Sequence, residues 1–387
     1  MRIVIGTHAL ARAAGTESYV CLVARQLQRL GHDVVVSAEE LGPMAEHAER
    51  QGIVVARTAA DMPSACDAIL ANDTPSAATL AAHYPGTRLV HVAHSQVFDH
   101  QLPVLVPGVA DALVVCSERM ASHARALSLD VPIVRLRLPV DIDHYLGTGP
   151  LPPRPRNAVI VSNYLTGERR RALVEAWEGQ GVTCTQIGVL TEASFDPGPA
   201  MRDADVVVAK ATAALEGMAC ERAVYVYDQF GGDGWITPDT YEAFEADNLA
   251  GLSSPAPRTP DQLAADLADY DPAMGWMNGE LVRTHHSPTK HAQELVAVLT
   301  GEHAGPPVPA SALTEIARLS RVAMAAERKA AGSQHELASL RERVVAADQD
   351  VAQWRSRAQA AEQVLSTSRA RAGIAAGRAL DRLRRLR

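Results

Sequence analysis

Aromatic side chains and long apolar runs are both scarce in this chain of 387 residues. Only 4% of the residues are Phe, Trp or Tyr, which argues against a surface that stacks successive nucleic-acid bases. The formal net charge of −8 also argues against a nucleic-acid partner. No apolar run reaches the roughly 18 residues that a transmembrane helix needs. With 47% hydrophobic residues, the composition instead indicates a folded globular protein.

Cysteine is also sparse, and its spacing excludes the usual cysteine-based sites. The five cysteines are Cys21, Cys66, Cys116, Cys184 and Cys220. None belongs to a C-x-x-C pair or to a zinc-binding pattern, so neither a disulfide framework nor a metal site is expected. Reduced thiols favour a cytoplasmic protein. The opening residues 1–10 predict a strand rather than a signal peptide.

Short apolar runs rich in β-branched residues alternate with helical patterns through most of the chain. Strands are predicted at 2–5, 33–36, 53–55, 68–70, 89–92, 112–115, 133–136, 158–161, 183–188, 205–208 and 224–227. Repeated βαβ units predict parallel sheets with helices on both faces, which is an α/β fold. The Pro- and Gly-rich residues 147–156 predict a linker. We therefore expect two Rossmann-like domains, 1–146 and 157–300, that face each other across a cleft.

The last quarter of the chain has a different pattern. Residues 301–310 form a second Pro- and Gly-rich linker before the segment 311–387. Small and apolar residues recur at heptad spacing over 316–365, which predicts an α-helical coiled coil through which chains self-associate. The segment 311–387 carries a net charge of +7, against −15 for the rest. Seven arginines within 369–387 predict peripheral contact with an anionic membrane.

Loops at the ends of the predicted strands contain the first candidate ligand contacts, because parallel sheets bind ligands at their carboxyl edge. Gly15 and Thr16 lie in the first such loop, whose amides can meet a ligand unless it is a plain turn. No G-x-G-x-x-G follows the first strand, which disfavours a nicotinamide dinucleotide. His94 follows a later strand, where it either contacts a sugar hydroxyl or is a structural histidine.

The loop and helix start at 162–171 hold polar and basic residues, among them Asn163 and Arg169. Cations at a helix N-terminus oppose the helix dipole. This arrangement is favourable if an anion such as a diphosphate binds there. The alternative is that the arginines lie on a solvated helix face.

The segment 204–220 is the most informative part of the sequence. An apolar strand leads through small residues into a helix that contains Thr212 and Glu216. A carboxylate at Glu216 can accept hydrogen bonds from both hydroxyls of a ribose, and Lys210 with the first helical amides suits a phosphate. The alternative role for Glu216 is to complement the helix dipole.

This segment, ADVVVAKATAALEGMACERAVYVYDQFGGDGW at 204–235, resembles the nucleotide-sugar site of GT-B glycosyltransferases. It is most similar to glycosyltransferase family 4, whose helix has the form LEAMACGRPV. LPVDIDHY at 138–145 is similar to the segment that leaves the first domain of that family. VIVSNYLTGERRRALVEA at 159–176 is similar to its phosphate-binding segment. The resemblance covers about residues 1–300.

The resemblance implies a transferase that moves a sugar from a nucleotide-diphosphate sugar to a glycan or lipid-linked acceptor. Such enzymes use the donor as substrate without a separate cofactor or metal, and this family retains the anomeric configuration. Polysaccharide or glycoconjugate synthesis at the inner face of the membrane is the implied setting. The alternatives are a GT-B sugar-nucleotide epimerase and a non-catalytic, degenerate transferase that serves as a coiled-coil assembly protein.

The resemblance also assigns roles to individual residues. Glu216 corresponds to the glutamate that holds the donor ribose, and His94 to a catalytic, donor-side histidine. Gly15 and Thr16 correspond to the glycine-rich loop near the donor phosphate and acceptor, and Arg169 falls near the phosphate-binding lysine. The positions of Asn163, Lys210 and Thr212 in their loops make them further donor-binding candidates. The sequence departs from the family at Val208, where the first glutamate of a pair is usual, and at Asn163, where an arginine is usual.

Overall fold

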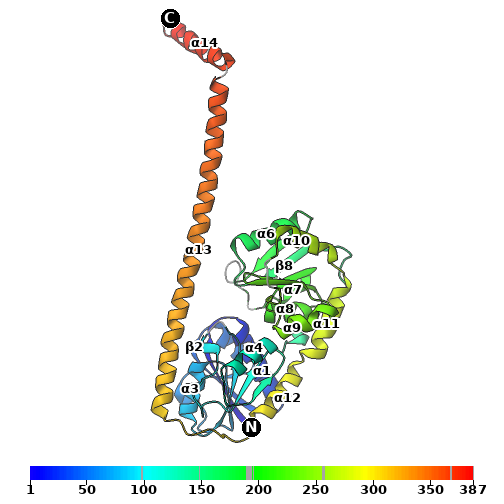
Figure 1. Ribbon diagram of the computed structural model, residues 1–387, viewed down its shortest axis with the longest axis vertical. Helices are drawn as coiled ribbons and strands as arrows, with labels where there is room; N and C mark the ends of the chain where they lie inside the picture. Colours follow the sequence, from blue (N-terminus) through cyan, green and yellow to red (C-terminus); the bar gives the residue numbers. More distant parts are fainter. Residues whose placement is uncertain are drawn as a thin grey trace. The chain divides into compact units, whose positions relative to one another are not determined.

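The computed structural model describes residues 1–96, 99–147, 149–188, 194, 196–254, 258–366 and 368–386. The chain divides into one compact unit, Met1–Met324, and a second unit, Ala325–Arg387. The first unit contains two sheets with their helices, which confirms the predicted α/β class (Figure 1).

The first sheet has seven parallel strands in the order β3-β2-β1-β4-β5-β6-β7. Its strands are β1 (Arg2–Leu10), β2 (Asp33–Leu41), β3 (Val54–Ala56), β4 (Ala68–Ala71), β5 (Arg88–Ala93), β6 (Ala112–Val115) and β7 (Ile133–Arg135). Every residue of β4 and β6 is buried, as expected for central strands that are covered on both faces. β1 and β2 extend several residues beyond their predicted ends, because they pair with each other as far as Leu10 and Leu41.

The connecting helices begin and end at recognisable signals. They are α1 (Gly15–Arg29), α2 (Pro43–Arg50), α3 (Thr74–His83), α4 (Glu118–Ala126) and α5 (Ile142–Tyr145). Asp73 caps α3 by accepting a hydrogen bond from the Ser76 amide, and Ser117 caps α4 in the same way. α1 ends just before Gly31, whose φ of 85° suits a helix terminus.

The second sheet has five strands in the order β12-β11-β10-β8-β9. They are β8 (Asn157–Val161), β9 (Thr183–Ile187), β10 (Val206–Ala209), β11 (Ala223–Asp228) and β12 (Gly231–Trp235). All pair in parallel except β12, which runs antiparallel to β11. The sequence predicted the four parallel strands but not β12.

Seven described helices between β8 and the start of α13 belong to the first unit. They are α6 (Gly167–Glu178), α7 (Gly198–Asp203), α8 (Ala211–Ala219), α9 (Pro238–Ala246), α10 (Pro260–Asp266), α11 (Ala273–His285) and α12 (Pro288–Leu299). α12 leaves the second sheet and packs beside α1, against the first sheet (Figure 1). The chain thus returns to the part of the first unit that contains the first sheet, which we call the first half; the part that contains the second sheet is the second half. The predicted domain limits remain predictions.

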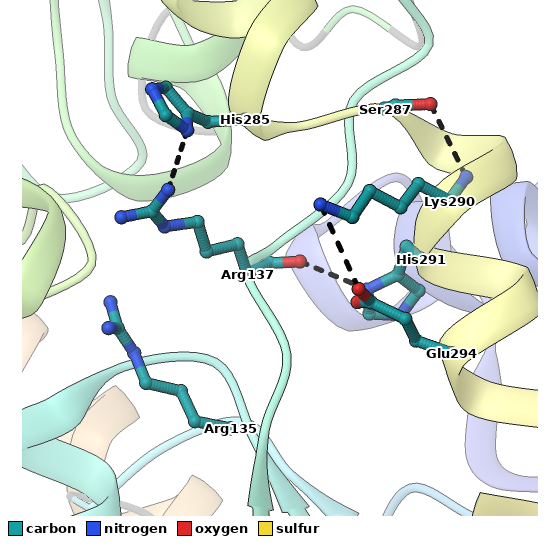
Figure 2. A pocket seen from close by; sticks show the side chains of 7 residues that line it. All are labelled: Arg135, Arg137, His285, Ser287, Lys290, His291 and Glu294. Atoms are coloured by element: carbon teal, nitrogen blue, oxygen red, sulfur yellow. Dashed lines mark hydrogen bonds and ion pairs between the residues drawn. The ribbon is translucent and has the colours of Figure 1, made fainter. Parts of the chain in front are cut away.

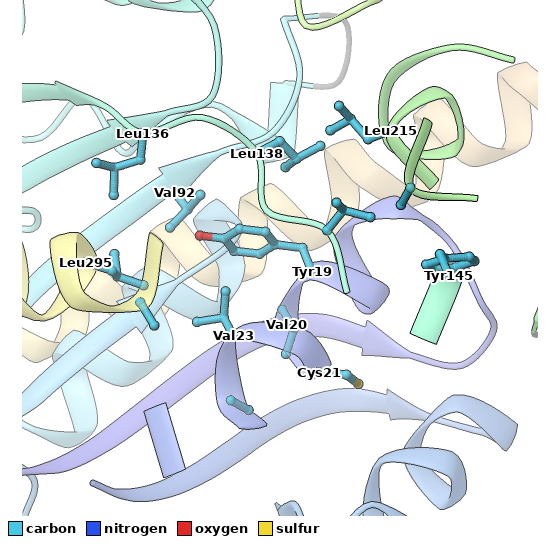
Figure 3. Close-up of a cluster of buried hydrophobic side chains, with 14 of the residues drawn as sticks. Tyr19, Val20, Cys21, Val23, Val92, Leu136, Leu138, Tyr145, Leu215 and Leu295 are labelled. Carbon is cyan, nitrogen blue, oxygen red and sulfur yellow. The ribbon is translucent and has the colours of Figure 1, made fainter. Parts of the chain in front are cut away.

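An apolar cluster around Tyr19 joins the two halves (Figure 3). Leu295 from α12, Leu215 from α8, and Leu138 from the segment after β7 all belong to it. The Tyr19 hydroxyl lies 2.9 Å from Nε2 of His291. The cluster therefore holds residues from both sheets' helices in one continuous core.

Two buried histidines reinforce this junction. Nδ1 of His291 lies 3.0 Å from the Arg137 carbonyl, and Nδ1 of His286 lies 2.7 Å from the Leu138 carbonyl. Nε2 of His286 lies 2.9 Å from the Tyr241 hydroxyl. Burial lowers the pKa of both histidines to about 4. Both rings are therefore neutral at neutral pH, with both nitrogens hydrogen-bonded.

The C-terminal segment is helical, in α13 (Ala310–Ser366) and α14 (Ser368–Arg384). The start of α13 belongs to the first unit, because Leu313, Ala317 and Met324 are buried there. The heptad positions predicted over 316–365, which we call the apolar seam, differ from these buried residues. Two of them, Leu319 and Val344, are 52% and 59% exposed. The coiled coil therefore remains a prediction. Within the described residues, no helix is both long and apolar enough to cross a membrane.

The close packing of α8 on the second sheet gives a test of this fold. A Cβ atom added to Gly217 would lie 2.8 Å from Cγ1 of Val207 on β10. We expect Gly217→Ala to lower the free energy of unfolding by about 1–3 kcal/mol through overpacking. Denaturant unfolding, followed by circular dichroism, measures this change.

Gly332→Ala is the matched control, because no atom lies within 4 Å of the position that its Cβ would take. It should leave the unfolding midpoint of the first unit unchanged. Equal midpoints for the two variants would contradict the described packing of α8.

Candidate functional site

A cavity of about 430 Å³ lies where loops from both halves of the first unit meet. The first half contributes the segment between β1 and α1 together with Ser18 and Tyr145. The second half contributes residues that follow β8, β9, β10 and β11 at their carboxyl ends. The lining is Arg12, Ala13, Ala14, Gly15, Ser18, Tyr145, Val161, Ser162, Asn163, Tyr164, Ile187, Gly188, Ser194, Pro197, Lys210, Ala211, Thr212, Ala213, Glu216 and Asp228. Five of the predicted site residues therefore line one cavity: Gly15, Asn163, Lys210, Thr212 and Glu216.

A buried ion pair forms part of the cavity wall. Nζ of Lys210 lies 2.7 Å from Oδ2 of Asp228, whose side chain is only 2% exposed. Oδ1 of Asp228 accepts a hydrogen bond from the Ser162 hydroxyl at 2.6 Å. The Ser162 oxygen in turn accepts from the amides of Tyr164 and Leu165. Lys210 is thus held in place, and its charge is balanced within the protein.

Two exposed aromatic rings flank Lys210 at the cavity. Its ammonium lies 5.1 Å from the ring centre of Tyr164 and 5.0 Å from that of Phe230. These are distances typical of cation–π contacts. Tyr164 lines the cavity, and Phe230 is 66% exposed. Within the described lining, the charged wall therefore adjoins the Tyr164 ring, while Phe230 contacts Lys210 from outside that lining.

The N-terminus of α8 opens into the same cavity. Ala211 has a φ of 49°, in the left-handed region that non-glycine residues rarely adopt, and its amide donates to the Leu249 carbonyl. The next amides, of Thr212 and Ala213, belong to the first helical turn, which has no acceptor within its own helix. A Cβ added to Gly15 would lie 3.6 Å from Oγ1 of Thr212. The first loop and the start of α8 therefore face each other closely.

Glu216 lies one turn further along α8. Burial raises the pKa of its carboxyl to about 7, while a hydrogen bond with Tyr145 lowers it and the charge of Asp196 raises it. Tyr145 belongs to α5, so this contact again links the two halves. An adjoining cavity of about 160 Å³ shares Ser18, Tyr145, Thr212 and Glu216 with the first. Glu216 therefore lines both cavities, and its carboxyl has a pKa near neutral pH.

Three predicted site residues lie outside the described lining of these cavities. Nε2 of His94 lies 2.9 Å from Oδ1 of Asn72, and burial, followed by the charges of His91 and His291, lowers the pKa of His94 to about 3. Thr16 accepts a hydrogen bond from the Gln101 amide group at 3.2 Å. The catalytic role of His94 and the donor-binding role of Thr16 remain predictions.

Arg169 is the third of these residues. Its guanidinium donates to the carbonyls of Asp228 and Gly231 at 3.1 and 3.2 Å, and lies 4.9 Å from the ring centre of Tyr227. These contacts brace the turn between β11 and β12. Arg12, Ser162, Tyr164 and Asp228 line the cavity but were not predicted. The sequence signal for Asp228 was its place at the end of a predicted strand.

A separate polar cavity of about 230 Å³ lies beside the segment that joins the two halves (Figure 2). It is lined by Arg135, Arg137, His285, Ser287, Lys290, His291 and Glu294. Both arginines already bind the buried carboxylate of Glu245 on α9. Arg137 also pairs with Glu242, and Lys290 with Glu294. These contacts tie β7 to the second half.

No cluster of three or more His, Cys, Asp or Glu side chains within the described part of the chain could hold a metal ion. The permanent charges that line the 430 Å³ cavity belong to Arg12, Lys210 and Asp228, with Glu216 titrating near pH 7. The groups available to a ligand there are hydrogen-bonding side chains, helix amides and fixed cations.

Comparison with known proteins found matches only among solved structures. No protein-family model and no curated protein sequence matches the chain. The structure of Anabaena Alr3699/HepE in complex with UDP and glucose matches with a TM-score of 0.56 and 13% identity, over 77% of this chain and 99% of that chain. The same protein in complex with UDP-glucose matches with a TM-score of 0.55 at 13% identity, over the same shares.

A glycosyltransferase from Rickettsia africae ESF-5 matches with a TM-score of 0.53 and 14% identity, over 77% of this chain and 97% of that chain. These similarities extend over nearly the whole of each matched protein. At such low identity they establish the fold. The two sheets are therefore arranged in the GT-B fold.

Proposed function

We propose that this protein is a glycosyltransferase that uses a nucleotide-diphosphate sugar as donor. The observation that carries the proposal is the position of Glu216, whose carboxyl lies in an interdomain cavity one turn from an open helix N-terminus. A volume of about 430 Å³ suits a small organic ligand, for which pockets of roughly 300–1,000 Å³ are usual. The fold shared with Alr3699/HepE and the residues of the LEGMAC segment support the same proposal.

In this proposal the donor ribose binds Glu216, and its diphosphate binds near the first turn of α8. A carboxylate accepts hydrogen bonds from vicinal hydroxyls, and helix amides with the positive end of the dipole suit phosphate. The same groups would stabilise the diphosphate as it leaves. Transfer would then need no metal, and the resemblance to family 4 favours retention of configuration.

The acceptor in this proposal is a glycan or a lipid-linked sugar of polysaccharide or glycoconjugate synthesis. The support is the arginine-rich end of the chain, where exposed Leu380 and Leu383 lie on α14 among arginines. Arginines attract anionic lipid by about 1 kcal/mol each near a membrane surface. We propose peripheral association with the cytoplasmic face of the membrane through 369–387, and self-association through 316–365.

Replacing Glu216 tests the donor site. We expect Glu216→Ala to weaken binding of the nucleotide-sugar donor by about 10- to 150-fold, since a hydrogen bond to a charged group contributes about 1.5–3 kcal/mol. Calorimetric titration with a panel of UDP-, GDP-, ADP- and dTDP-sugars, with and without EDTA, identifies the donor and measures the loss. Glu168→Ala is the matched control, because Glu168 lies in the first turn of α6 and outside the cavity lining.

The products separate the proposal from its alternatives. Transfer of the sugar to an acceptor, or its release to water, supports a transferase. Conversion of the free donor into an epimer would replace the proposal by an epimerase, and absence of binding to every donor in the panel would leave an assembly protein.

The raised pKa of Glu216 predicts a pH dependence. Ribose hydroxyls donate to the carboxylate, so binding should favour the ionised form and lower the pKa of Glu216 from about 7. Donor affinity should therefore increase as the pH rises from 5.5 to 7 and level off above it. Glu216→Gln cannot ionise and should show a flat profile in the same titrations. A wild-type affinity that does not change over this range would argue against ribose at Glu216.

Truncation tests the role of the tail. Deletion should begin at residue 325, because Leu313, Ala317 and Met324 are buried in the first unit. We expect deletion of 325–387 to leave donor affinity unchanged, to lower the number of copies per particle that light scattering measures, and to abolish sedimentation with phosphatidylserine vesicles.

A matched full-length variant separates the two roles. Leu340→Glu with Val344→Glu replaces two exposed seam positions and keeps every arginine. It should lose self-association while retaining part of the vesicle binding. If truncated and intact chains contain the same number of copies per particle and sediment alike, neither role belongs to the tail.

A further inference from the structure

A donor diphosphate carries negative charge that the cavity must balance. Within the described lining, the permanent cations are Arg12 and Lys210. The sequence has Asn163 where the resembling family has a phosphate-binding arginine, and Arg169 lies outside the lining. Which cation binds the diphosphate therefore depends on what Lys210 and Arg12 already contact.

Lys210 already forms an ion pair with Asp228. The two charged atoms lie 2.7 Å apart, and Asp228 is buried and held by the Ser162 hydroxyl. Moving Lys210 to a phosphate would leave a buried carboxylate without its counter-charge, which is strongly unfavourable. The pair as a whole adds no net positive charge to the cavity.

The guanidinium of Arg169 is also already in contact with other groups of the protein. Its guanidinium donates to two backbone carbonyls and stacks over Tyr227. Both carbonyls belong to the turn that carries Asp228, so a movement of Arg169 would also disturb the ion pair. A ligand in the cavity therefore gains no free cation from this arginine.

Arg12 is in a different position. It lies on the exposed segment between the end of β1 at Leu10 and the start of α1 at Gly15, and it lines the cavity from the first half. Burial raises the pKa of Tyr164 on the opposite half, as does Asp228, and the charge of Arg12 counteracts this rise. Arg12 thus lies within electrostatic reach of the far wall. It makes no ion pair with any residue that the structure describes.

We propose that Arg12 is the cation that binds the donor diphosphate, together with the first-turn amides of α8. A guanidinium offers two parallel donors to phosphate oxygens, which a lysine cannot match. Because Arg12 comes from the first half and α8 from the second, the diphosphate would contact both halves at once. This inference rests on the proposed function and adds a residue that neither the family pattern nor the LEGMAC segment identifies.

The test compares ligands with and without phosphate. Full-length protein is titrated calorimetrically with UDP, GDP, ADP and dTDP, and then with the nucleoside of whichever diphosphate binds. We expect Arg12→Gln to weaken diphosphate binding at least tenfold and to leave nucleoside binding unchanged. Arg12→Lys should restore part of the loss. Arg154→Gln, an exposed arginine in 147–156, is the matched control and should bind both ligands as the wild type does.

Each outcome bears on a different claim. If the wild type binds none of the four diphosphates, the proposed function fails, and this inference with it. If the wild type binds one and Arg12→Gln binds it equally well, this inference is wrong and the proposed function stands. Equal weakening of diphosphate and nucleoside, or a lower thermal midpoint of the variant, would assign Arg12 a structural role and also overturn it.

Discussion

The cavity exists because an apolar core runs without interruption between the two halves of the first unit. Tyr19 of α1 lies at its centre, among residues from α8, α12 and the segment after β7. Its hydroxyl meets His291, whose other ring nitrogen lies against the Arg137 backbone carbonyl. A chain with this core must bring the start of α1 to the start of α8. The close approach of Gly15 and Thr212 is a direct result.

Electrostatics divides the cavity walls into neutralised and available groups. In the second half, Lys210 forms an ion pair with the buried Asp228. This pair holds the loops after β8 and β11 in place and leaves no net charge for a ligand. The carboxyl of Glu216, by contrast, is poorly solvated, and burial raises its pKa to about 7 despite its hydrogen bond with Tyr145. Lys210 precedes the first residue of α8, and Glu216 lies further along the same helix. The cavity thus combines a fixed, neutralised wall with a carboxyl that titrates near neutral pH.

The sequence predicted the α/β class and every parallel strand that the structure describes, because apolar β-branched runs indicate buried strands directly. It missed β12, whose GGDGW sequence lacks that mark. A Cβ on Gly232 would lie 2.5 Å from the ring of Tyr227, so packing against an aromatic side chain requires glycine there. Gly275 and Gly279 likewise allow α11 to approach Glu221 closely. The contacts of Lys210 with Asp228, and of Arg169 with the turn between β11 and β12, join residues far apart in the chain. No local sequence pattern predicts them.

The neutral histidines at the junction set the conditions under which the two halves stay together. His286 and His291 have a pKa of about 4 in the folded chain, against about 6.5 for an unfolded histidine. The unfolded state therefore binds more protons over this interval, and the free energy of unfolding falls as the pH drops from 6.5 towards 4. His91 and His94, whose pKa values burial lowers to about 4 and about 3, act in the same sense, and Glu216 acts in the opposite sense. The junction between the halves thus carries a pH dependence that the apolar side chains around it do not have.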